Sequence, residues 1–141
     1  MRIRLSVAAL GVGLVVLSVA PMRAHHAFSS EFDANRPVKL TGTVTKMEWV
    51  NPHSWIHIDV KKPDGTVENW AIEGGTPNTL LRRGLRKSDL PAGTVIKVDG
   101  YQAKDRGLRA NGNNLTLSDG RQMFLGSSGT GAPYDADAEK K

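Results

Sequence analysis

The stretch at residues 38–60 alternates apolar and polar side chains, the pattern of half-buried β-strands, and it constrains the fold of this chain most strongly. The alternation begins at Val38 and changes phase by one residue near Lys46. This change predicts a bulge in a long, curved first strand, which is typical of small barrels. Asn51 and Pro52 then form a turn into a second, antiparallel strand.

The second strand has two chemically different faces. One face is expected to join the core and carries Ser54, Ile56, Ile58 and Val60. The opposite face is free for function and carries His53, Trp55, His57 and Asp59. The structural and functional halves of this strand are therefore separated by its period of two.

The remaining elements follow in a simple order. Further strands are predicted at residues 67–73, 94–101 and 115–117, with a turn that leads into 123–125. A compact helix is predicted over residues 76–84, because Thr76 can cap it, Pro77 suits its first turn and Gly84 suits its end. Three strands, one helix and two strands predict a mainly β, five-stranded OB-like Greek-key barrel with the helix between strands three and four. Another small β-barrel or roll is the alternative.

The first 24 residues have the layout of a secretory signal peptide. Two arginines precede an uncharged apolar run at residues 5–20, which is shorter than the ~20 residues of a spanning helix. Cleavage is therefore expected in preference to a retained anchor, and no membrane span is expected afterwards. The favoured cut follows Ala24, because a cut after Ala20 would place Pro21 first. The protein is expected to be exported to the periplasm.

Removal of this segment changes the charge balance. The full chain has 19 Lys and Arg against 14 Asp and Glu, a net charge of +5. Without its first three arginines the net charge falls to +2, so nucleic acid is not an expected partner. The chain has no Cys, which excludes disulfides, thiolate metal sites and thiol catalysis.

The mature chain divides into three parts. Residues 25–37 form an N-terminal arm, either extended or one short helical turn docked by Phe28 and Phe32. Residues 38–125 form the barrel domain. Residues 126–141 are small and polar and are expected to be a disordered tail.

Several segments together resemble a known family of small exported bacterial proteins, catalogued only as a domain of unknown function. The segments are His25-His26 with Phe28, FDANRPVKLTGTV (32–44), EWVNPHSWIHIDV (48–60), NWAIEGGTPNTLLRRG (69–84) and VDGYQAKD (98–105). The His-His start and the Asn-Pro-His turn are the most specific marks. The resemblance covers about residues 25–125 and implies a periplasmic location and an OB-like barrel, but no established activity.

All four His lie at the expected mature N-terminus or around the Asn-Pro turn. Imidazole suits copper, zinc and nickel, and His25 at a free N-terminus can chelate through its ring and its α-amine together. His53 and His57 are four apart, which is ~13 Å along a strand, so they do not easily share one metal. The sequence predicts a copper-type site made by His25 and His26 with His53 or His57. His53 is preferred because the turn is more accessible.

This metal site has a simpler alternative. His26 would then be a surface residue, His57 a cross-strand partner of Trp or Asp, and His53 a turn residue that caps the local backbone. The metal hypothesis also depends on cleavage after Ala24, since a cut after Ala20 removes the α-amine from the site.

A second candidate is a ligand face on the barrel. It would be made by Trp49, Trp55 and Tyr101, with Arg82, Arg83, Arg106 and Arg109. The alternative is that these Trp belong to the core and these Arg are solvated.

Catalysis has little support in the sequence. Asp59, Glu68 and Glu73 are the available acids and Ser54 lies beside His53, but no triad or carboxylate-pair spacing appears. We therefore expect a periplasmic binding protein that is not an enzyme. The alternative function is a metal-free interaction module that binds an envelope protein, a peptide or a glycan on the barrel face.

Overall fold

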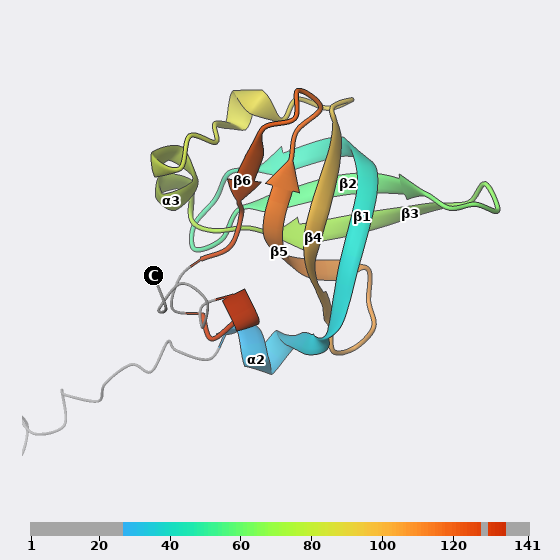
Figure 1. Cartoon of the computed structure of the whole chain (residues 1–141), viewed down its shortest axis with the longest axis horizontal. Helices are drawn as coiled ribbons and strands as arrows, with labels where there is room; N and C mark the ends of the chain where they lie inside the picture. Colours follow the sequence, from blue (N-terminus) through green and yellow to red (C-terminus); the bar gives the residue numbers. More distant parts are fainter. Residues whose placement is uncertain (1–26, 128–129, 135–141) are drawn as a thin grey trace, which may run out of the picture.

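The computed structural model describes residues 27–127 and 130–134, and it is organised around one β-sheet (Figure 1). In chain order the elements are α2 (Ala27–Glu31), β1 (Phe32–Glu48), β2 (Trp55–Lys61), β3 (Val67–Glu73), α3 (Pro77–Arg82), a 3-10 helix (Lys87–Asp89), β4 (Val95–Ala103), β5 (Arg109–Thr116) and β6 (Gln122–Phe124). No helix in these described ranges is long and apolar enough to cross a membrane.

The sheet has the strand order β3-β2-β1-β4-β5-β6. An additional parallel pairing joins Ala71, Ile72 and Glu73 of β3 to Arg109, Ala110 and Asn111 of β5. This pairing makes a nearly closed ring of five strands, with β6 outside it and α3 between β3 and β4. The mainly β class and the helix position are confirmed, whereas the sheet has six strands and not the five predicted.

β1 is the long, curved strand that joins the two halves of the sheet. Residues 37–43 pair with β4, and residues 43–48 pair with β2. The register shifts between Val44 and Lys46, which confirms the predicted bulge. The strand starts earlier than expected, because Phe32 already pairs with Ala103 of β4. The start of the arm is a short helix, α2, docked by buried Phe28, as one of the two interpretations predicted.

One apolar core fills the ring. Ile56 and Ile58 are completely buried, as the alternation predicted, whereas Val60 is only half-buried. Complete burial of one such side chain stabilises the fold by about 1.5–3 kcal/mol. The core also contains Val44, Met47, Trp70, Ile72, Leu80, Leu85, Leu90, Ile96, Val98, Ala110, Leu115, Leu117 and Leu125.

A second apolar cluster joins the two ends of the described chain. It contains Phe28, Phe32, Ala103, Ala132 and Tyr134. The Tyr134 ring also meets the Phe124 ring edge-on, with centroids 4.9 Å apart. Ala132 and Tyr134 are thus buried, although they lie within the segment 126–141 that the sequence analysis expected to be a disordered tail. The expected signal peptide, His25, His26 and residues 135–141 lie outside the described residues.

Candidate functional site

His53 lies in the turn between β1 and β2, and the backbone there is tied to the end of β3. The Ser54 N–H donates to the Gly75 carbonyl at 3.0 Å, and the Gly74 N–H donates to the Ser54 carbonyl at 2.8 Å. These bonds hold His53 beside Glu73, the last residue of β3. Nδ1 of His53 contacts Oε1 of Glu73 within hydrogen-bonding distance.

Glu73 is only 6% exposed, so its carboxylate needs internal partners. Its second oxygen, Oε2, accepts from Nδ2 of Asn111 at 3.2 Å. The Tyr134 hydroxyl donates to Oδ1 of Asn111 at 3.1 Å. His53, Glu73, Asn111 and Tyr134 therefore form one connected polar chain, which we call the His53 chain. The parallel pairing of β3 with β5 sets Glu73 directly opposite Asn111.

The His53 chain determines which imidazole nitrogen is available. An ionised carboxylate only accepts, so Nδ1 of His53 carries the hydrogen that Glu73 accepts. In the neutral imidazole Nε2 then keeps its lone pair, and the His53 side chain is 27% exposed. An imidazole oriented in this way by a buried carboxylate suits a metal ligand or a hydrogen-bond acceptor.

His57 has a different acidic neighbour. Its Nε2 lies 3.4 Å from Oε1 of Glu48 on β1, and its side chain is 25% exposed. Nε2 is buried and has no hydrogen-bond partner among the described residues, so the contact is an electrostatic approach. The Glu48 pKa is lowered chiefly by the hydrogen bond from Lys46, with a smaller contribution from His57. His53 therefore faces the β3 side of β2 and His57 faces the β1 side, and the structure does not bring them together.

The N-terminal arm approaches the other end of the His53 chain. Phe28, three residues after His25, is buried in the same cluster as Tyr134. Three residues of extended chain span about 10 Å. Among residues 27–127 and 130–134, no three His, Asp or Glu side chains form a group that could hold a metal. A metal site of the predicted type would thus need His25 and His26.

Tyr101 lies in a different cluster from Trp49, so the predicted ligand face is not one aromatic cluster. Trp49 packs against the main core, whereas Tyr101 belongs to the second cluster, with its ring 5.5 Å from that of Phe28. Trp55 is half-buried and lies in register between Glu48 and Glu73. No ring contact joins Trp49, Trp55 and Tyr101 in the part of the chain that the structure describes.

Two of the arginines named with this face have other partners. Arg109 forms ion pairs with Glu31 and Asp105. Arg83 lies over the Phe124 ring, 4.4 Å from its centroid.

The acids named as catalytic candidates have structural partners. Glu68 accepts from the Trp70 indole at 3.0 Å, and Asp59 accepts from Asn69 at 2.9 Å. Ser54 is completely buried, and its Oγ has no hydrogen-bond partner among the described residues. Of the acids named, Glu73 is the one that contacts His53.

Asn111 and Tyr134 were not among the residues predicted for the site. Asn111 lies in the polar run Asn-Gly-Asn-Asn, which carries no alternation to mark it. Tyr134 had one available signal, since it is the only aromatic residue after Phe124.

The sequence matches a family described as "Family of unknown function (DUF6152)" over residues 13–112. The chain belongs to this family. The predicted resemblance to a family of unknown function is thereby confirmed. No curated protein and no solved structure matches the chain. The DUF6152 match includes His25, His53, Glu73 and Asn111 and ends before Tyr134.

Proposed function

We propose that this DUF6152 protein is a periplasmic binding protein that holds a copper-type metal ion with His25, His26 and His53, without turnover. The observation that carries the proposal is the contact between Nδ1 of His53 and buried Glu73. The ring order β1-β2-β3-β5-β4, with α3 between β3 and β4, supports an OB-like Greek-key barrel as the scaffold.

The chemistry of the His53 chain favours a metal ligand. Histidines that bind metals usually donate their other ring N–H to a carboxylate or carbonyl, which fixes the ring and makes the ligand nitrogen more basic. Glu73 supplies that carboxylate for His53, and Asn111 holds Glu73 in place. The nitrogen-rich set completed by His25 and His26 is the type that Cu(II) prefers.

The position of the arm supports His25 as a partner of His53. Phe28 anchors the arm in the cluster that contains Tyr134, and Tyr134 is the last member of the His53 chain. His57 is less favoured, because its Nε2 is buried beside Glu48.

The test uses exported protein whose first residue has been identified by mass spectrometry. Cu(II) is titrated by calorimetry and followed by electron paramagnetic resonance. We expect binding of one ion, a loss of at least tenfold in affinity for His53→Ala and His25→Ala, and little change for His57→Ala, the matched control. A chain with Met ahead of His25 should also bind more weakly, because its terminal amine is displaced.

Two results would overturn the proposal. One is stoichiometric binding that is unchanged in both His25→Ala and His53→Ala. The other is no binding at micromolar Cu(II), which would favour the metal-free interaction module.

A further inference from the structure

We propose that a pocket beside α3 binds a phosphate-type oxyanion, as the free ion or as a phosphate monoester. The pocket has a volume of about 390 Å³. Two guanidinium groups and three hydroxyl groups line it, from Thr76, Thr79, Arg82, Arg83 and Ser127. Among the described residues that line it there is no carboxylate. Its chemistry is therefore rich in donors and positive charge.

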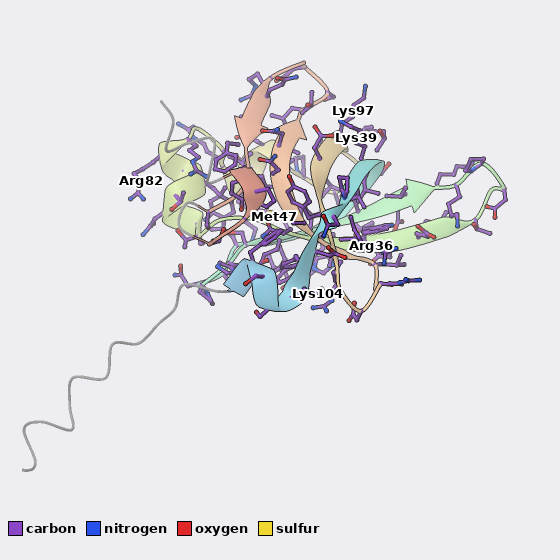
Figure 2. All side chains as sticks on the ribbon, turned by 60° about the horizontal axis from the view of Figure 1, so that its bottom comes forward. Arg36, Lys39, Met47, Arg82, Lys97 and Lys104 are labelled. Atoms are coloured by element: carbon purple, nitrogen blue, oxygen red, sulfur yellow. The ribbon has the colours of Figure 1, made fainter. Side chains whose placement is uncertain are left out.

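The fold fixes the two walls of this pocket. Leu80 is completely buried and holds α3 against the core. Arg83 donates to the Gly126 carbonyl and lies over the Phe124 ring, which ties the end of α3 to the segment after β6. Figure 2 shows Arg82 projecting from α3 toward solvent, on the side of the molecule away from Arg36. One arginine is thus anchored by the segment after β6, and the other projects outward and makes one long hydrogen bond, to Thr79 at 3.4 Å.

Two hydroxyl groups of this pocket have no acceptor for their hydrogens among the described residues. Thr76 Oγ1 accepts from the Thr79 N–H at 3.2 Å and donates to Thr79 Oγ1 at 3.0 Å. Arg82 Nη2 also donates to Thr79 Oγ1, at 3.4 Å. The Thr79 oxygen therefore accepts twice, and no described residue accepts its own hydroxyl hydrogen. The buried Ser127 Oγ likewise has no partner in the described chain.

Charge at the pocket also favours an anion. Burial lowers the Arg83 pKa, and the neighbouring positive charge of Arg82 lowers it further, although Tyr134 acts in the opposite direction. An oxyanion would lie beside both positive charges and accept hydrogen bonds from both guanidinium groups. It would also accept the hydroxyl hydrogen of half-buried Thr79 and that of the buried Ser127 Oγ, which is costly to leave unpaired.

This pocket is independent of the copper proposal. It contains no His, and none of its lining residues belongs to the His53 chain. Failure of one proposal therefore leaves the other unaffected.

The test is a titration of the ¹⁵N-labelled mature chain, followed by NMR at fixed ionic strength. Inorganic phosphate and phenyl phosphate are added in separate experiments. We expect saturable shifts of the Thr79, Arg83 and Ser127 amides with at least one of them. Tighter binding of phenyl phosphate identifies a monoester site, and tighter binding of phosphate identifies a site for the free ion.

Three variants make the test specific. Arg82→Gln should weaken binding about tenfold, because it removes a charged hydrogen-bond donor. Ser127→Ala should weaken it by a factor of about three to ten, because it removes one neutral donor. Arg36→Gln removes the same charge elsewhere and should leave affinity unchanged. Shifts that do not saturate, or an equal loss in Arg36→Gln and Arg82→Gln, would overturn the proposal.

Discussion

The Tyr134 hydroxyl donates to Oδ1 of Asn111 over 3.1 Å, although Tyr134 lies beyond the last strand of the sheet. This bond connects the C-terminal segment to the His53 chain. The Asn111 amide thereby has a partner on each side, since its Nδ2 donates to buried Glu73. Residues from three parts of the chain therefore determine how the His53 imidazole is held.

The first prediction concerns that hydroxyl. Tyr134→Phe keeps the ring that packs on Phe124 but leaves buried Asn111 Oδ1 without its donor. We expect a loss of about 1–3 kcal/mol in the free energy of unfolding, measured with urea. Tyr101→Phe is the control, because Tyr101 packs in the same cluster but is only half-buried. Equal losses in both variants would show that the bond to Asn111 does not stabilise the fold.

The second prediction compares the two Glu–His contacts. Glu73→Gln keeps the size of the side chain but removes the negative charge that polarises His53. We expect Cu(II) affinity to fall about 10–100-fold, the usual effect of removing a carboxylate that accepts a hydrogen bond from a metal-binding His. Glu48→Gln makes the matched change beside His57 and should alter affinity less than about threefold. A larger effect from Glu48→Gln would assign the ligand role to His57.

Local sequence patterns were enough to predict several elements. β3 has the predicted bounds, Val67–Glu73, because its alternation is regular and is bounded by turn residues. α3 is capped by Thr76, begins at Pro77 and is followed by Gly84 at φ +87°, as its cap chemistry indicated. In both elements the deciding interactions are between residues close in sequence.

Other features depend on contacts between distant segments and could not be predicted in this way. β5 begins six residues before the predicted strand at residue 115, and Ala110 and Asn111 are buried where it pairs with β3. Tyr134 is buried because Phe28, Phe32 and Phe124 form the surface that it covers. The contact of His53 with Glu73 likewise depends on the turn meeting the end of β3. No local sequence pattern indicates these contacts between distant segments.

The third prediction tests the close approach of β4 and β5. A Cβ at Gly100 would lie 2.3 Å from the Asn111 carbonyl oxygen, which is backbone and cannot rotate away. Gly100→Ala should therefore destabilise the protein by about 1–3 kcal/mol, although Ala is otherwise favoured over Gly within a strand. Asn114→Ala, at an exposed position of β5, is the control and should change stability by less than about 0.5 kcal/mol. An unchanged unfolding midpoint for Gly100→Ala would contradict this packing.

The fourth prediction concerns acid stability at Glu68. The hydrogen bond from the Trp70 indole, followed by that from Lys62, lowers the Glu68 pKa below its ordinary value of 4.5. A lowered pKa in the folded state means that ionised Glu68 stabilises the fold above pH 4.5, and that this contribution is lost as the pH falls through the lowered value. The carboxyl carbon of Glu68 and the indole N–H of Trp70, followed by NMR, should titrate together below pH 4.5. Lys62→Gln should move this midpoint upward, and Glu68→Gln should remove the indole titration. An indole signal that still titrates in Glu68→Gln would mean that another group controls it.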